Sequence, residues 1–126
     1  MQAIEPGRVT AVYLFTGDTS AVIVANNTGT STLYGEVDPL VKVGKRVKAG
    51  TTLGTIALLP HGSSMLHLEL YAGRVDRNKQ WPSGSPQPAG LLNPDAYVAR
   101  ASQRRKKKGG SGVLLALATI AAVLLV

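Results

Sequence analysis

The chain has 126 residues, of which 14 are Lys or Arg, 7 are Asp or Glu and none is Cys. This length predicts one domain with a tail, and the lack of thiols excludes cysteine chemistry. Residues 1–99 hold 8 basic and 7 acidic side chains, so the positive charge belongs to the C-terminal end. The nearly neutral part shows no interleaved basic and aromatic residues of the kind that stack on bases. We therefore expect no nucleic-acid partner.

Short apolar runs bounded by turn residues predict β-strands along most of residues 1–99. Alternation along the last of these runs places three Leu residues on one face and His67, Glu69 and Tyr71 on the other. The expected strands are Arg8–Thr16, Ala21–Ala25, Thr30–Val37 and Leu66–Tyr71, with Gly44, Gly50 and Gly54 punctuating the apolar pieces between the last two.

The segment Trp81–Gly90 is rich in Pro, Ser and Gly and is expected to form a loop. We expect the Trp81 side chain in this loop to cover the barrel-like β domain described below rather than to be exposed as a contact residue. One short helix should begin at Asn93-Pro94-Asp95, because Pro and Asp favour the first turn of a helix. These elements predict an all-β fold for residues 1–99, namely a compact antiparallel barrel-like or sandwich domain.

Four segments carry a family resemblance through their order and spacing. They are Thr32–Val37, Val43–Gly54, Met65–Leu70 and Asn93–Val98. Together they resemble the core of the lysostaphin-type zinc endopeptidases, which cut peptidoglycan cross-bridges. The resemblance covers residues 3–98 and implies a peptidase-like β domain.

The departures from this family affect its zinc site. The resemblance implies a zinc ion held by a His, an Asp four residues later and the second His of an H-x-H motif, which is His67 here. Met65 replaces the first His of that motif, and Glu36 replaces the catalytic His of the family's Y-x-H strand. The His–Asp pair would lie upstream of the segment that matches Arg8–Thr16. Because a hydrolytic zinc site needs about three protein ligands, we expect no zinc, no catalytic residue and an inactive domain.

The candidate groove contacts are therefore Glu36, His67 and Glu69. For His67, a half-buried strand residue bonded to a neighbour is favoured over a groove contact, and a metal ligand comes last. Glu36 is expected to face solvent or to line the groove. Glu69 is expected to pair with a strand neighbour such as a Lys or Arg, and His61 lies in a turn where it should be solvated.

The C-terminal sequence predicts a membrane anchor. Five basic residues, Arg104, Arg105, Lys106, Lys107 and Lys108, precede a Gly/Ser segment and an entirely apolar run at 113–126. Residues 109–126 would form about 27 Å of helix at ~1.5 Å per residue, close to the ~30 Å hydrocarbon core. We expect a linker at 100–112, a membrane helix at 113–126 that begins as early as 109, and the basic run at the lipid headgroups. A C-terminal helix packed on protein is the alternative, and residues 1–12 do not resemble a signal peptide.

The sequence thus predicts an inactive peptidoglycan-endopeptidase-like domain, anchored in a bacterial cell membrane or the internal membrane of a virion, with the β domain on the side of the basic run. Its expected role is structural, scaffolding or cell-wall-binding, and its expected partners are the lipid bilayer, other protein subunits and peptidoglycan. Three alternatives remain open. They are a structural protein of a membrane-containing bacteriophage, an active zinc enzyme with ligands from another chain, and a biotinyl/lipoyl-like carrier. The last is disfavoured because no Met-Lys pair is present.

Overall fold

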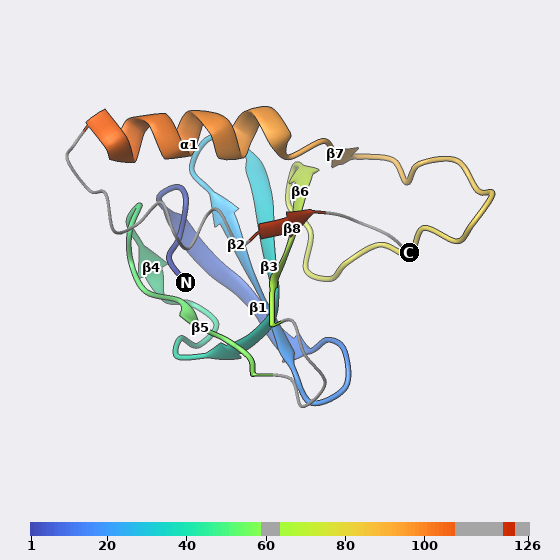
Figure 1. Cartoon of the computed structure of the whole chain (residues 1–126), viewed down its shortest axis with the longest axis horizontal. Coiled ribbons are helices and arrows are strands. Elements are labelled where there is room, and N and C mark those ends of the chain that lie inside the picture. Colours follow the sequence, from blue (N-terminus) through green and yellow to red (C-terminus); the bar gives the residue numbers. More distant parts are fainter. Residues whose placement is uncertain (59–63, 108–119, 123–126) are drawn as a thin grey trace.

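The computed structural model describes residues 1–58, 64–107 and 120–122 and shows a β-sheet crossed at one end by a helix (Figure 1). The described strands form one sheet in the order β4-β1-β2-β3-β6-β7, with β5 paired to β3 and β8 paired to β6. The elements are β1 (Gly7–Leu14), β2 (Ser20–Asn26), β3 (Thr30–Pro39), β4 (Arg46–Val47), β5 (Gly54–Ile56), β6 (Leu66–Ala72), β7 (Leu91–Leu92), α1 (Asp95–Lys107) and β8 (Ile120–Ala122). The four strands expected from the sequence are present, with small shifts at their ends.

Consecutive hairpins build the centre of the sheet. β1 pairs antiparallel with β2, β2 with β3, and β3 with β6. The turn between β2 and β3 closes through a hydrogen bond from the Gly29 amide to the Asn26 carbonyl, 3.1 Å. Gly29 has a φ of 98°, a conformation that glycine adopts without a steric cost. The short turn fixes the register of β3 and thereby the position of β6 beside it.

The main core lies on one face of the sheet, where side chains of the strands pack with those of α1. All three Leu residues of β6 point into it, as the alternation predicts, and Tyr97 and Ala101 of α1 pack there too. The Tyr97 hydroxyl lies 3.1 Å from the Thr32 hydroxyl in β3 and 3.5 Å from the Asn26 amide nitrogen. These contacts hold the helix against the sheet.

The helix α1 is longer than the short helix expected from the sequence. The Asn93 side-chain oxygen accepts a hydrogen bond from the Asp95 amide, 2.9 Å, and so caps its first turn. It continues to Lys107, so residues 100–107 are helical rather than the linker that we predicted. Ala, Arg, Gln and Lys are strong helix formers, and Ala101 is buried against the sheet, which extends the helix past the N-P-D signal.

The sheet is open among the described residues, which differs from the barrel-like or sandwich arrangement that we expected. Its path runs from β4 at one edge to β7 at the other, and no pairing joins these two strands. Both edge strands have only two residues, too few to continue the ladder. Mostly antiparallel pairing, as predicted, is confirmed.

The expected membrane segment is described only at three residues. Ile120–Ala122 form β8, which pairs with β6 in parallel register, where we expected a helix. The other residues of 109–126 lie outside the described part of the chain. Across residues 1–58, 64–107 and 120–122, no helix has the length and apolarity that a bilayer crossing requires.

Candidate functional site

The candidate site lies on the face of β6 opposite the main core. His67, Glu69 and Tyr71 alternate along this strand with the three core Leu residues. Tyr71 belongs to a second hydrophobic cluster, formed with Ala21, Ile23, Leu33 and Leu91. The predicted separation of the two faces is therefore confirmed, and it brings two titratable side chains and a phenol into one row.

The three side chains form a hydrogen-bonded row. The His67 Nε2 atom lies 2.7 Å from Glu69 Oε2, and the Tyr71 hydroxyl donates to Glu69 Oε1. The Lys79 amide in turn donates to the Tyr71 oxygen at 2.9 Å. Glu69 is only 7% exposed, and both of its carboxylate oxygens are bonded within the protein. Burial, followed by the hydrogen bond to Glu69, raises the pKa of Tyr71 above its usual value.

Glu69 pairs with strand neighbours, as expected, but these are not the Lys or Arg that we named as examples. Its partners are His67 and Tyr71, two residues away on either side along the same face of the strand. The nearby Lys79 side chain instead donates to the Ala89 carbonyl at 2.5 Å. For His67, the favoured interpretation is confirmed, since the residue is half-buried and bonded to a strand neighbour.

An aromatic contact holds the His67 ring from the other side. Phe15 meets it edge to face, with 5.0 Å between the ring centroids. Gly35 in β3 is registered with His67, and a Cβ atom at Gly35 would lie 2.8 Å from the Phe15 ring. Because Gly35 has no side chain, Phe15 occupies the space above β3 and reaches His67. The alternation pattern of the sequence does not reveal this contact, because Phe15 lies just after β1.

Glu36 lies at an irregularity of β3. Tyr34 is registered with Val22 and Val37 with Ser20, so β3 has one residue more than β2 across this interval. Glu36 takes up the extra residue with a φ of 60°, a conformation that L-residues rarely adopt. Its carbonyl accepts a hydrogen bond from the Ala57 amide, 3.0 Å, and its side chain is half-buried. The Glu36 carboxylate is not part of the His67–Glu69–Tyr71 row.

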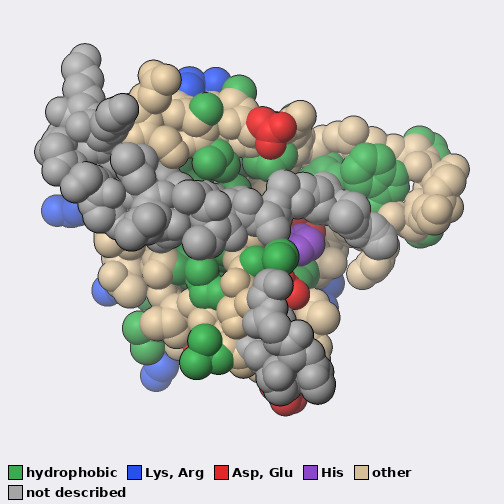
Figure 2. Space-filling model, viewed as in Figure 1, with side chains coloured by type: hydrophobic (Ala, Val, Ile, Leu, Met, Phe, Trp, Pro, Cys, Tyr) green, Lys and Arg blue, Asp and Glu red, His purple; other side chains and the backbone are tan. Residues whose placement is uncertain are grey.

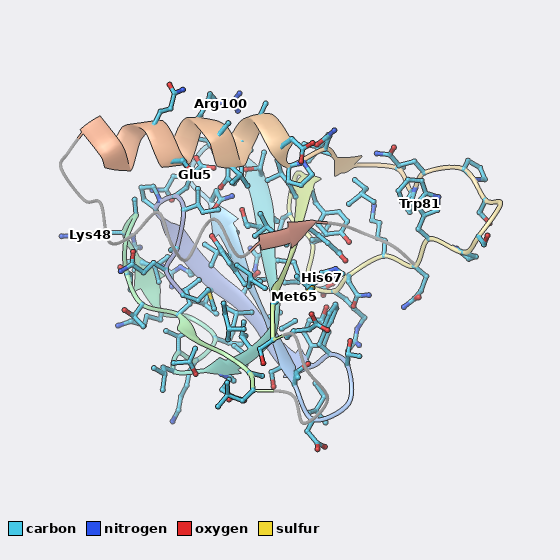
Figure 3. The ribbon with its side chains drawn as sticks, in the orientation of Figure 1. Glu5, Lys48, Met65, His67, Trp81 and Arg100 are labelled. Atoms are coloured by element: carbon cyan, nitrogen blue, oxygen red, sulfur yellow. The ribbon has the colours of Figure 1, made fainter. Side chains whose placement is uncertain are left out.

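Met65 lies just before β6, two residues from His67, and the two side chains are neighbours in Figure 3. Met65 is 37% exposed. Zinc takes three or four ligands from imidazole, thiolate and carboxylate groups, and a thioether is not one of them. The Nε2 atom of His67 is already bonded to Glu69. Within the described part of the chain, no three His, Cys, Asp or Glu side chains gather in a group that could hold a metal ion. His61 lies outside the described residues.

The loop before β7 covers part of this face. Trp81 packs against the second hydrophobic cluster, as expected for a covering residue, and its Nε1 atom donates to the Ser85 carbonyl at 2.9 Å. The Tyr13 hydroxyl donates to the side-chain oxygen Oδ1 of Asn78 and accepts a hydrogen bond from the backbone N–H of the same residue, both at 2.8 Å. These bonds fix the loop to β1. The sequence showed no sign of the Tyr13–Asn78 pair, which is 65 residues apart.

In the space-filling view, the Lys and Arg side chains that can be seen lie at the margin of the face shown (Figure 2). Of the predicted membrane-surface residues, Arg104–Lys107 belong to the last turns of α1, and Lys108 lies outside the described residues.

Comparison with solved structures identifies a protein of similar fold. A structure of LytU superposes with a TM-score of 0.62 at 22% sequence identity, covering 79% of this chain and 64% of LytU. The chain thus spans less than two thirds of the LytU length. A mutant catalytic domain of the prophage-encoded M23 protein EnpA from Enterococcus faecalis gives a TM-score of 0.47 at 27% identity, covering 77% of this chain and 68% of that domain. A search among curated proteins found no match.

The sequence profile of peptidase family M23 matches residues 1–80, more than half of the chain. The match includes the Y-x-H-like strand β3 and the H-x-H-like segment at the start of β6, the two segments that flank the candidate site. It agrees with the likeness of the fold to LytU. The chain belongs to peptidase family M23.

Proposed function

We propose that this chain is a catalytically inactive M23 domain that acts as a membrane-attached binding or scaffolding module for cell-wall peptide. The observation that carries the proposal is the bond between His67 and Glu69 at 2.7 Å, beside Met65. The one histidine that matches a family ligand is thereby engaged within the fold. Met65, two residues before it, carries a thioether, which is not among the usual zinc ligands and does not transfer protons.

The packing around this row supports a binding role rather than a hydrolytic one. A hydrolytic site needs ligands for the metal and an open position for water. Here Phe15 packs on the His67 ring, and Tyr71 holds the second oxygen of Glu69. The His67 Nε2 atom and both Glu69 carboxylate oxygens are therefore bonded within the chain. The partly exposed Met65 and His67 remain available to contact an extended peptide chain.

The proposal of membrane attachment is supported by the sequence of the C-terminal tail. Residues 113–126 carry no charged side chain and follow five consecutive basic residues. Basic side chains beside an apolar segment lie at the headgroups of anionic lipids. Four of these five basic residues, Arg104–Lys107, belong to the last turns of α1.

The hydrolytic part is tested with purified full-length chain, zinc and insoluble peptidoglycan. We expect the release of free amino groups to equal that of the His67→Ala variant. Zinc-dependent release above that level would contradict the proposal. Co-sedimentation with the same peptidoglycan tests binding. We expect Met65→Ala to weaken it several-fold, whereas Leu40→Ala, which truncates an exposed apolar residue at 70% exposure, should not.

Membrane attachment is tested by vesicle flotation after carbonate extraction. A positive charge in the middle of a span costs roughly 2.5–3.5 kcal/mol on insertion scales. We therefore expect Ala118→Arg to move the protein toward the soluble fraction, and a chain ending at Lys107 not to float. The matched variant Ala118→Leu should float like the wild type. If the full chain floats no better than the chain ending at Lys107, the tail is not an anchor.

A further inference from the structure

The strand that carries His67 has one edge that other strands cover only in part. On one side, β6 pairs with β3 from His67 to Ala72. On the other side, β7 pairs with Leu70 and Tyr71 only. The remaining stretch of this edge, Leu66–Leu68, is paired with β8. Without β8 this stretch would present unpaired backbone groups next to the candidate site (Figure 1).

The sequence of this edge lacks the devices that prevent strand pairing. Natural edge strands are protected by Lys, Pro, bulges or covering segments. The segment Met65-Leu66-His67-Leu68 contains no Lys and no Pro, and the pairing of β6 with β3 continues through His67 without a bulge. Such an edge accepts an extended apolar segment, because main-chain hydrogen bonds supply the binding and apolar side chains suit its surface.

We propose that the β6 edge at Leu66–Leu68 is a strand-accepting surface whose occupant is this chain's own C-terminal segment Ile120–Ala122, and that this segment leaves the edge when the tail enters lipid. The register places Leu66 beside Ile120, His67 beside Ala121 and Leu68 beside Ala122. The backbone of the candidate site residue is thus covered by the tail. The second half of the proposal rests on the membrane attachment proposed above.

The two locations of the tail exclude one another. In a membrane span, the backbone groups bond within a helix, because lipid offers no partner. In β8, the backbone of the same residues pairs with β6. Residues 120–122 therefore cannot occupy both places in one molecule.

The parallel direction of β8 agrees with the path of the chain. Parallel strands in one sheet need a crossover of a dozen or more residues, which is usually helical. Between β6 and β8 the chain passes through β7 and the 13-residue helix α1. The chain between β6 and β8 therefore has the length that a parallel crossover needs, and departure of β8 would leave that edge open to another extended peptide.

Cysteine cross-linking tests the register, because the natural chain has no cysteine. Registered residues of neighbouring strands lie about 4.8 Å apart, within the Cα separations of ~4.4–6.8 Å that disulfides span. We expect the double variant His67→Cys/Ala121→Cys to form an intramolecular disulfide at least tenfold faster than the matched control His67→Cys/Ala116→Cys in lipid-free solution. Equal rates, or disulfides found only between two copies, would overturn the assignment of β8 as an internal strand.

Phosphatidylglycerol vesicles test the competition with lipid. We expect them to slow disulfide formation in the 67/121 pair at least tenfold. An unchanged rate in chains that float with the vesicles would overturn the exchange between edge and lipid. If the wild-type chain does not float, while the 67/121 disulfide forms in solution, the proposed membrane attachment fails and the internal strand stands.

Hydrogen exchange provides a measurement that leaves His67 intact. A Pro within a strand removes an amide donor from the ladder. We expect Ala121→Pro to speed amide exchange in the Leu66–Leu68 segment at least tenfold in lipid-free solution, whereas Ala116→Pro, outside β8, should leave it unchanged. Equal exchange in both variants and the wild type would overturn the proposal, even if the cysteine variants fail to fold.

Discussion

The hydroxyl of Tyr97 in α1 lies 3.1 Å from the hydroxyl of Thr32 in β3, and both side chains are buried. This hydrogen bond and the packing of Ala101, which is 1% exposed, join the helix to the main core. The helix is therefore part of the domain, although the sequence alone placed the domain boundary at residue 99. Residues 101–107 lengthen α1 to 13 residues, whereas the six residues before them would form only a marginal helix on their own.

The first prediction concerns this boundary. A chain ending at Lys107 should unfold cooperatively, whereas one ending at Arg100 loses Ala101 and half of the helix. We expect the shorter chain to be less stable by about 1–3 kcal/mol, since each buried methyl or methylene group contributes ~0.8 kcal/mol and a six-residue helix is marginal. Urea unfolding monitored by circular dichroism measures the difference. Equal midpoints would show that residues 101–107 do not stabilise the domain.

The second prediction concerns alkaline pH. Burial raises the pKa of Tyr97 and of Tyr71 in the folded chain above the usual value. The folded chain therefore keeps protons that the unfolded chain loses above about pH 10. The stability from these groups is fully present below that pH and is lost as the pH rises toward their folded pKa values. We expect the free energy of unfolding of the chain ending at Lys107 to fall above about pH 10.

The double variant Tyr71→Phe/Tyr97→Phe provides the control for this pH dependence. It removes both hydroxyls, so its free energy of unfolding should decline less steeply above pH 10, whatever its stability at pH 7. Urea unfolding at several pH values measures both slopes. An unchanged slope would show that other groups cause the alkaline loss of stability.

The third prediction concerns the space above Gly35. A Cβ atom there would lie 2.8 Å from the Phe15 ring and would push that ring away from His67. Overpacking of this kind costs about 1–3 kcal/mol, so Gly35→Ala should lower the free energy of unfolding by this amount. Adding Phe15→Leu should recover part of the loss. If the single and double variants are equally unstable, the strain does not arise from the Phe15 ring.

The fourth prediction concerns the bond between Tyr71 and Glu69. Tyr71→Phe leaves a buried Glu69 oxygen and the Lys79 amide without their partner. An unsatisfied buried group costs about 1–3 kcal/mol, and urea unfolding should show a loss of this size. Lys79→Ala is the control, because it removes the ammonium 6.0 Å from the Tyr71 ring centroid but keeps the backbone amide that bonds to the Tyr71 oxygen, so it should cost less stability than Tyr71→Phe. A larger effect of Lys79→Ala than of Tyr71→Phe would contradict this account of the row.

The sequence by itself determined the strands, the two faces of β6 and the family resemblance, because these depend on local patterns. Alternation has a period of two wherever a strand buries one face, so Leu66 and His67 could be assigned to opposite faces. The expectation that Met65 stands where the family has a histidine also needs no coordinates. The same local reasoning ended α1 too early, because the burial of Ala101 depends on a sheet that is distant in sequence.

Only the tertiary structure decided which side chains meet. Glu69 bonds to His67 and Tyr71 rather than to a basic residue, and Phe15 reaches His67 across β3 because Gly35 leaves room. The pairing of β8 with β6 is likewise invisible in an apolar tail whose composition suits lipid equally well. The physical reason is common to all three. Composition fixes how much apolar surface a segment must bury, whereas the register and edges of the sheet decide where it is buried.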